Sequence, residues 1–484
     1  MIGNAEARPA GWKEILGRQH GPSLALVCAG VWLHAADGLL VSTMTPAIVA
    51  DIGGIALIPW TVALYEIGSI VAGAASGLLA LRFGVRRPMA LAACLFAFGC
   101  AVSALAPEMW VLLAGRLLQG FGGGGLMALS FVSVSRLFPS RLMARVMGAL
   151  STVWAASAFM GPLIGGLFVE LATWRLGFWA FAAQAAVLAV WLASRREVSA
   201  RTPEAAQRGR FPFVRLLWLC AGVVAIAYAG VSVGAIRTPV FVAIGLVCLM
   251  IFLLLDASRP ASRLLPQHPF SLRRPVGAAL TMILCFAAAT VAIGLYVPFV
   301  ITRLHGVSAL VAGYVIALEA IAWAISAALL SGLPEKRDRL AIVTGLVIVT
   351  ISIPGFAYAV PNGPVVLVAL CGILQGAGFG MAWTFILRRA TAIAPRGDTD
   401  LVAGAIPTVQ RLGYALGAAY MGIIANAWGI EHADADGELE RAATAIFLAC
   451  LPLTVVGLIA TARFVRGEPA AANDQQPDEV SSRR

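Results

Sequence analysis

The chain has 484 residues, of which 60% are hydrophobic and 12% are charged, and its mean hydropathy is +0.88. Soluble domains carry about 25% charged residues, so this composition excludes a soluble enzyme or binding domain and indicates an integral membrane protein. The formal net charge of +11 does not indicate a nucleic-acid partner. The basic residues lie in short segments between apolar runs, where they act as orientation signals and contacts for anionic lipid.

About fourteen apolar runs are each long enough to cross a hydrocarbon core of about 30 Å as a helix. We therefore expect an all-α integral membrane fold with spans at 23–49, 59–81, 88–107, 109–133, 146–170, 175–193, 214–233, 239–256, 276–301, 308–333, 340–360, 363–386, 401–427 and 442–464. The polar arm before the first span (1–22) shows no cleavable signal peptide. The polar tail (467–484) has a composition that predicts disorder.

Lys and Arg residues are distributed unevenly between the two sets of alternating loops. Of the 35 Lys and Arg residues, 29 fall on the side that carries both termini, here called the arginine-rich side. Four fall on the other side, namely Arg175, Arg237, Arg303 and Arg441. The positive-inside rule predicts that the arginine-rich side is cytoplasmic. We expect a multi-pass protein of the cell inner membrane with both termini in the cytoplasm.

Three short patterns recur at nearly one offset. Leu118-Gln119-Gly120 reappears as Leu374-Gln375-Gly376, Ser76-Gly77-Leu78 as Ser331-Gly332-Leu333, and the positions of Ser157, Gly161 and Gly166 as Gly413, Gly417 and Gly422. The repeat predicts two six-helix bundles, at 23–193 and 275–466. A linker region (194–274) with cytoplasmic loops and two extra helices separates them, and we expect these helices to be peripheral because the repeat gives them no counterpart.

Charged residues inside the predicted spans require an explanation, because each costs about 2.5–3.5 kcal/mol at the centre of a membrane. They are Asp37, Glu66, Arg116, Glu319 and Arg411. Burial favours the protonated form of a carboxyl group and a nearby guanidinium favours the ionised form, so a conformational change can couple proton movement to substrate movement. We assign proton coupling to Asp37, Glu66 and Glu319, with Arg116 as the partner. Static ion pairs between helices are the alternative.

Four polar residues are candidates for a substrate cavity: His34, Gln119, Gln375 and Arg411. His34 precedes Asp37 by three residues, on the same helical face. A buried, hydrogen-bonded imidazole is the alternative for His34, and hydrogen bonds across helices are the alternative for both glutamines.

Several of these motifs resemble those of the major facilitator superfamily, and in particular its fourteen-span drug:proton antiporter family. The motifs are Gly77-Leu-Leu-Ala-Leu81-Arg82-Phe-Gly84-Val-Arg86-Arg87, Arg116-Leu-Leu-Gln119-Gly120, Asp37 with Pro46, Trp60 and Tyr65, Gln410-Arg411-Leu-Gly413, and Gly161-Pro162-Leu-Ile-Gly165-Gly166. The resemblance implies a major facilitator fold with a cytoplasmic gate loop at Gly77, Arg82, Gly84, Arg86 and Arg87. It also implies an antiporter-like seam at Gly161, Pro162, Gly165 and Gly166.

Two departures from the family pattern bear on the gate and on the substrate. Leu81 stands where the family loop has an acid that helps to latch the gate, and Ser42 stands where the first span has Asn. We expect the seam to pack against the opposite bundle through Gly165, since glycine permits close approach of helices.

These observations predict a secondary active transporter that exports a small amphipathic organic compound, a drug or a metabolite, in exchange for protons. Proton-coupled uptake of a metabolite or vitamin such as riboflavin by the same fold is the alternative. A membrane-embedded enzyme is not indicated, because no metal-binding cluster or nucleophile-base signature is found. We expect no cofactor or metal and no nucleic acid. The expected partners are the small-molecule substrate, protons and membrane lipids, and the protein is expected to be a monomer that could work with a periplasmic adaptor.

Overall fold

The computed structural model describes residues 12–194, 211–395, 397–432 and 437–467, and in these ranges its regular structure is helical. A short α1 (Trp12–Ile15) precedes fourteen longer helices: α2 (Gly21–Ile52), α3 (Ile58–Phe83), α4 (Arg86–Ala104), α5 (Met109–Leu137), α6 (Met143–Leu171), α7 (Trp174–Ser194), α8 (Phe213–Ala229), α9 (Arg237–Ala257), α10 (Pro275–His305), α11 (Ala309–Leu330), α12 (Asp338–Asn362), α13 (Val365–Ala392), α14 (Thr399–Ala427) and α15 (Glu438–Arg466). Half of the predicted N-terminal arm and nearly all of the predicted disordered tail lie outside the described residues.

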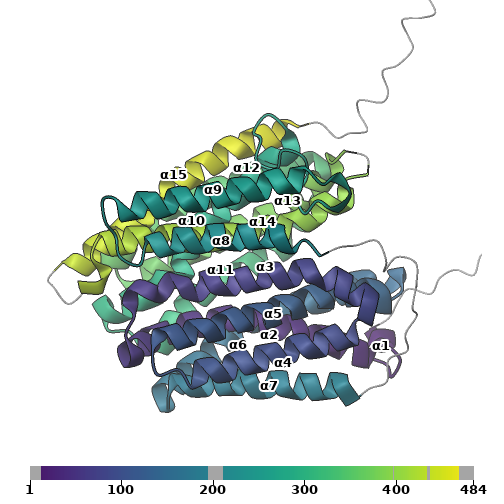
Figure 1. Cartoon of the computed structure of the whole chain (residues 1–484), viewed down its shortest axis with the longest axis horizontal. Helices are drawn as coiled ribbons and strands as arrows, with labels where there is room; N and C mark the ends of the chain where they lie inside the picture. The colour runs from purple at the N-terminus through teal and green to yellow at the C-terminus, as the bar shows by residue number, and fades with distance from the viewer. Residues whose placement is uncertain (1–11, 195–210, 396, 433–436, 468–484) are drawn as a thin grey trace, which may run out of the picture.

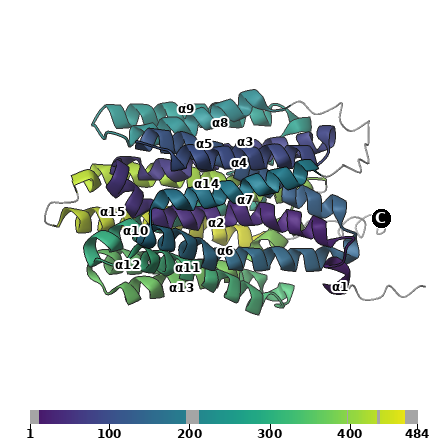
Figure 2. The same cartoon turned by 90° about the horizontal axis from the view of Figure 1, so that it is seen from below.

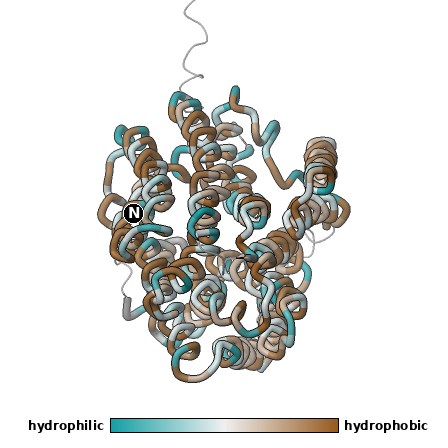
Figure 3. Tube along the Cα trace, turned by 90° about the vertical axis from the view of Figure 1, so that its left-hand side faces the viewer, coloured by the Kyte–Doolittle hydropathy of each residue, from teal (hydrophilic) through white to brown (hydrophobic). Residues whose placement is uncertain are grey.

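Twelve of the described helices are long and apolar enough to cross a membrane. The other two long helices are α8, which is apolar but only 17 residues long, and α14, which has 29 residues and carries Gln410 and Arg411. Both run alongside the twelve in the same bundle (Figure 1). Seen along the helices, the bundle is coloured mainly as hydrophobic (Figure 3). The predicted all-α membrane fold is confirmed.

The long helices pack in two groups, here called the first half (α2–α7) and the second half (α10–α15). In the first half, α5 packs against α2, α3 and α4, while α2 also packs against α6. In the second half, α13 packs against α11 and α12, while α10 packs against α14 and α15. Figure 1 shows α2, α4, α5 and α7 on one side of the molecule and α10, α12, α13 and α15 on the other.

Matching glycines bring matching helices together in the two halves. A Cβ atom placed on Gly120 of α5 would overlap the carbonyl oxygen of Tyr65 on α3. A Cβ atom on Gly376 of α13 would overlap the carbonyl oxygen of Glu319 on α11 in the same way. Only a residue without a side chain permits such an approach. The sequence repeat is therefore a repeat of helix packing.

The halves meet most extensively along two helix pairs, α6 with α11 and α3 with α14, and α2 also packs against α10 and α11. At the first pair, a Cβ atom on Gly166 would lie 2.6 Å from the Cα of Leu310. Gly165, in contrast, faces Leu40 and Thr43 of α2, within its own half. The expectation that Gly165 packs against the opposite half is therefore wrong. Adjacent residues on a helix point about 100° apart, and the residue that meets α11 is Gly166.

The predicted antiporter-like seam on α6 has two further contacts. Gly161 faces Ala36 and Leu39 of α2, and Pro162 lies close to Gly313 of α11. The seam thus divides its residues between the two halves, with Gly161 and Gly165 packed inside the first half and Pro162 and Gly166 packed across to the second.

The second pair, α3 with α14, is closed at one end and open at the other. Near the start of α3, Pro59 packs where a Cβ atom on Gly422 would lie 2.8 Å away. Toward the arginine-rich end, no atom lies within 4 Å of a Cβ placed on Gly73 or Gly77 of α3, or on Gly404 of α14. Open space therefore adjoins α3 and α14 toward the arginine-rich end.

Helices α8 and α9 form a hairpin on one flank of the molecule. Figure 2 shows α9 outermost with α8 beneath it. Helix α8 packs against α14 of the second half and against α3 of the first half. The extra pair is thus less peripheral than the sequence suggests, since α8 contacts both halves.

Candidate functional site

A buried ion pair joins α2 to α5 in the centre of the first half. Arg116 Nη1 lies 2.6 Å from Asp37 Oδ2, and the two side chains are 2% and 0% exposed. The other carboxylate oxygen, Asp37 Oδ1, is buried without a hydrogen-bond partner. An unpaired buried charge is very costly, so the two side chains hold each other in place. The expected partnership of Asp37 and Arg116 is seen in the structure.

Arg116 has further partners that fix its orientation. Its Nε donates to the carbonyl oxygen of Thr61 over 3.2 Å, and its Nη1 also donates to Gln119 Oε1. Gln119 Nε2 in turn donates to Ser103 Oγ over 3.2 Å. The guanidinium carbon lies 4.5 Å from the centre of the Tyr65 ring, in cation–π contact. Gln119 thus bonds across helices in this conformation.

A second ion pair crosses from one half to the other. Arg411 on α14 donates from Nη1 to Glu66 Oε2 over 3.1 Å and to Ser69 Oγ over 2.7 Å, both on α3. Glu66 therefore pairs with Arg411 and not with Arg116, the partner that the sequence suggested. The two residues are 345 positions apart, and the sequence offers no signal that would join them.

His34 and Tyr65 connect the two ion pairs. Arg411 Nη2 lies 3.0 Å from His34 Nε2, and the Tyr65 hydroxyl lies 2.8 Å from His34 Nδ1. Because a guanidinium can only donate, Nε2 must accept, and the hydrogen of a neutral imidazole is then on Nδ1 and directed at Tyr65. The polar chain runs from Asp37 through Arg116, Tyr65 and His34 to Arg411.

The intramembrane acid of the second half lies in a separate cluster. Gln375 Nε2 donates to Glu319 Oε1 over 3.3 Å, and Ser352 Oγ donates to Gln375 Oε1 over 2.9 Å. The four residues expected to couple protons are therefore divided, with Asp37, Arg116 and Glu66 in one polar chain and Glu319 apart from it.

A small, largely apolar hollow lies in the second half, between α10, α12, α13 and α14. Phe286, Phe379 and Trp383 line it together with two polar residues, Gln410 and Tyr414. Gln410 donates to the Tyr414 hydroxyl over 3.1 Å. Concave apolar sites with few polar groups are typical of small-molecule binding, so this hollow is a candidate for part of a substrate site.

The predicted gate loop has no acid at Leu81, whose side chain is 41% exposed. At the end of α5, Arg136 donates to the carbonyl oxygen of Ala80 over 2.9 Å. Gly84 has a φ of +75°, a backbone conformation that favours glycine. The second half has the corresponding tie, from Arg388 to the carbonyl oxygen of Leu333 over 3.2 Å.

The corresponding loop of the second half, unlike the first, has an acid beside its arginine. Arg388 donates to both carboxylate oxygens of Asp338, over 3.1 Å from Nε to Oδ2 and by a shorter contact from Nη2 to Oδ1. Of the other predicted gate residues, Arg82 and Arg86 both have interacting partners. Arg87 is the second residue of α4, and Gly77 faces open space.

Sequence reasoning gave no site role to four polar residues of the site, namely Thr61, Tyr65, Ser69 and Ser103, although it named Tyr65 in a family-like motif. A signal was present for three of them. Thr61, Tyr65 and Ser69 recur every four residues along α3, which places them on one helical face. Ser103 has no such signal, because its role depends on the position of Gln119.

The paired charges buried in a helical bundle, with an open seam between two repeated halves, are features of a membrane transporter. The family model described as Major Facilitator Superfamily matches residues 26–373, and the chain belongs to that superfamily. It is a multi-pass membrane transporter.

Individual relatives agree with this assignment. A probable multidrug-efflux transporter of Mycobacterium tuberculosis is 29% identical over 93% of this chain and 95% of its own length. The riboflavin transporter RibZ of Clostridioides difficile is 24% identical over 82% of this chain and 86% of its own length. Among solved structures, a mutant of the peptide transporter POT in complex with sulfate matches with a TM-score of 0.67 and 15% identity, covering 93% of this chain and 96% of the other.

Proposed function

We propose that this transporter is a proton-coupled antiporter that exports a small amphipathic organic compound across the inner membrane, with its arginine-rich end in the cytoplasm. The observation that carries the proposal is the buried Asp37–Arg116 pair, whose Oδ1 atom has no partner. That oxygen is the atom at which we place the transported proton. The name of the mycobacterial relative, a probable multidrug-efflux transporter, supports the direction of transport.

The charge balance of the polar chain supports coupling. Asp37 and Glu66 supply two negative charges, and Arg116 and Arg411 supply two positive charges. A proton added to either carboxyl leaves one guanidinium without its ionic partner in a site of low polarity, which is unfavourable. Movement of Arg411 with the second half would relieve that excess charge. Proton binding would thereby favour a change in how the halves meet.

The energy available is sufficient for export against a gradient. A membrane potential of 100 mV is worth about 2.3 kcal/mol for each charge moved, which supports roughly fifty-fold accumulation. The hollow beside Phe379 and Trp383 provides an apolar, aromatic surface for an amphipathic substrate.

The test is transport by Asp37→Asn in proteoliposomes with an imposed pH gradient. Asparagine keeps the shape of the side chain and cannot ionise, so we expect loss of uphill transport in protein that still folds. The matched control is Asp51→Asn, which makes the same change on the same helix. Asp51 is at the end of α2, where it pairs with Arg175. Full pH-driven accumulation by Asp37→Asn would refute the assignment of the proton to Asp37.

Uptake of a metabolite or vitamin is the second candidate function, because one relative is named a riboflavin transporter. Everted and right-side-out membrane vesicles distinguish the two directions. Export predicts that substrate accumulates inside everted vesicles when their interior is acidified. Accumulation in right-side-out vesicles driven by an inward proton gradient would instead favour uptake.

A further inference from the structure

We infer that helix α8 is a lateral seal, fixed to the second half, that covers the α3–α14 seam and shields the Glu66–Arg411 pair from lipid. The inference gives a function to the extra helix pair, which has no counterpart in the repeat. It does not depend on the direction of transport or on proton coupling.

The first observation is that α8 fills the seam with apolar side chains. Leu219 and Val223 of α8 belong to one buried apolar cluster with Ile67 and Ile70 of α3 and Leu412 of α14. Ile67 follows Glu66 directly, and Ile70 follows Ser69, the two residues of α3 that receive Arg411. The inner face of α8 therefore lies beside the charged contact between the halves.

The second observation is that the opposite face of the hairpin is apolar and exposed. On α8, Leu217 and Val224 are 56% and 37% exposed, and on α9 Val247 and Leu254 are exposed as well. Exposed apolar faces of membrane helices are covered by lipid. Without α8, lipid would reach the α3–α14 seam, where an ion pair in contact with hydrocarbon is unfavourable.

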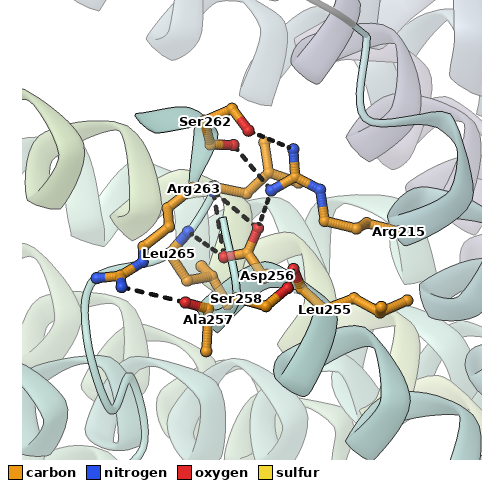
Figure 4. Close-up of polar contacts among 9 residues, drawn as sticks. Arg215, Leu255, Asp256, Ala257, Ser258, Ser262, Arg263 and Leu265 are labelled. Atoms are coloured by element: carbon orange, nitrogen blue, oxygen red, sulfur yellow. Dashed lines mark hydrogen bonds and ion pairs between the residues drawn. The ribbon is translucent and has the colours of Figure 1, made fainter. Parts of the chain in front are cut away.

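The third observation is a buried polar cluster that fixes the hairpin at its arginine-rich end (Figure 4). Arg215 of α8 lies 2.6 Å from Asp256 of α9 and donates to the carbonyl oxygen of Ser262 over 2.8 Å. Asp256 also accepts from the backbone N–H groups of Leu264 and Leu265, each over 3.0 Å. These residues belong to the segment that leads into α10. The cluster therefore attaches the hairpin to the segment that precedes the second half.

The fourth observation is a tie at the other end of α8. Asn426 of α14 donates from Nδ2 to the carbonyl oxygen of Gly230 over 2.6 Å, and a Cβ atom on Gly230 would lie 3.0 Å from the backbone nitrogen of Ile423. The same amide also reaches the carbonyl oxygen of Ala56 over 3.1 Å, in the first half. One end of α8 is thus attached to the segment that leads into α10 and the other end to α14 of the second half, while its contact with α3 is apolar packing.

This asymmetry predicts that α8 moves with the second half and that α3 slides along it. Helices α8 and α14 run in the same direction. Gly230 meets Ile423. The positions eleven residues earlier, Leu219 and Leu412, therefore lie at the same height along the two helix axes. Helix α3 runs the other way from Pro59, which meets Gly422, so Ile70 is at the same level. These three positions allow each contact of α8 to be fixed separately.

The first experiment measures lipid access by photolabelling with a phospholipid that carries a diazirine in its acyl chain. Leu219→Ala with Val223→Ala thins the inner face of α8, and Leu217→Ala with Val224→Ala removes the same atoms from the outer face. We expect peptide 58–83 of α3 to be labelled severalfold more in the inner-face variant than in the wild type or the outer-face control. Equal labelling in all three proteins would overturn the inference.

The second experiment uses cross-links and does not require a weakened helix. In a background without the native cysteines, Leu219→Cys is joined by a short flexible reagent to Leu412→Cys or to Ile70→Cys. We expect transport to survive the α8–α14 cross-link and to be lost, with recovery on cleavage of the reagent, in the α8–α3 cross-link. Loss of transport in both, or in the α8–α14 pair alone, would show that α8 does not move with the second half.

Discussion

The two halves of the transporter share a packing scheme but differ in the charges that they bury. Gly120 and Gly376 bring matching helices into contact, and Arg136 and Arg388 make matching ties to backbone carbonyl oxygens. The buried Asp37–Arg116 pair, in contrast, has no counterpart at the corresponding positions of the second half. The difference shows that a duplicated backbone can carry unduplicated chemistry. In the proposed mechanism, proton coupling depends on Arg411 of the second half, which pairs with Glu66 of the first half.

The largest expected effect comes from breaking the buried pair of the first half. Arg116→Leu leaves Asp37 as an unpaired buried acid, which typically costs about 3–5 kcal/mol of stability. Thermal unfolding in detergent measures the loss, and Asp37→Asn combined with Arg116→Leu should recover much of it. In the second half, Glu319→Gln keeps a polar partner for Gln375 and should cost far less. Equal losses from Arg116→Leu and Glu319→Gln would contradict the contrast between the halves.

Alanine substitutions at the repeated glycines test the shared packing. Gly120→Ala and Gly376→Ala each force a methyl group against a carbonyl oxygen, and overpacking of this kind costs about 1–3 kcal/mol. Gly73→Ala is the control, because open space surrounds that position and alanine favours a helix by about 0.5–1 kcal/mol. The measurement is the melting temperature of each variant. A lower melting temperature in only one of the two variants would mean that the two glycine contacts do not contribute equally to stability.

A double-mutant cycle measures the charge that crosses between the halves. Glu66→Gln, Arg411→Gln and the double variant should give a coupling energy of about 1 kcal/mol, within the range found for residues in direct contact. The pair is partly exposed, at 12% and 18%, so the effect should be smaller than at Asp37 and Arg116. Unfolding temperatures of the four proteins provide the cycle. Strictly additive single effects would show that the contact contributes nothing.

The smallest expected effect concerns the contacts that Arg136 and Arg388 make with backbone carbonyl oxygens. Asp338→Asn removes the acid that distinguishes the second tie from the first, and partly exposed ion pairs contribute about 0.2–1 kcal/mol. The loss should shrink as salt is added, because salt screens exposed charges. Arg136→Ala breaks a tie to a neutral carbonyl, so its effect should change little with salt. The melting temperatures of both variants are measured at low and high salt. An equal response of the two variants to salt would contradict this prediction.

The sequence was sufficient to predict the class of fold and one of the two ion pairs in the polar chain, that of Asp37 with Arg116. Apolar runs of span length and the alternation of Arg-rich loops give the membrane helices directly, because a bilayer imposes their length. Asp37 and Arg116 are rare charges in their spans, which marks them as partners. The glycine repeat is also visible, because close helix contacts require small residues.

The remaining features depend on contacts between distant segments. Glu66 and Arg411 belong to different halves, and nothing in either local pattern selects that pairing over one with Arg116. Gly165 and Gly166 are adjacent, and the rotation of α6 decides which of them meets the second half. The contacts of α8 with α3 and α14 are made by ordinary apolar residues, which carry no signal of their partner.

The pairing of Glu66 with Arg411 has a consequence for the order of synthesis. The acid is made 345 residues before the arginine that receives it, and at about 5–20 residues per second that interval is roughly 17–70 s. During this time the first half is in the membrane without the cation of α14. A buried acid that lacks a partner is most stable in its neutral form, so Glu66 should enter the bilayer carrying a proton. The first deprotonation of Glu66 would then mark the arrival of α14 and the completion of the fold.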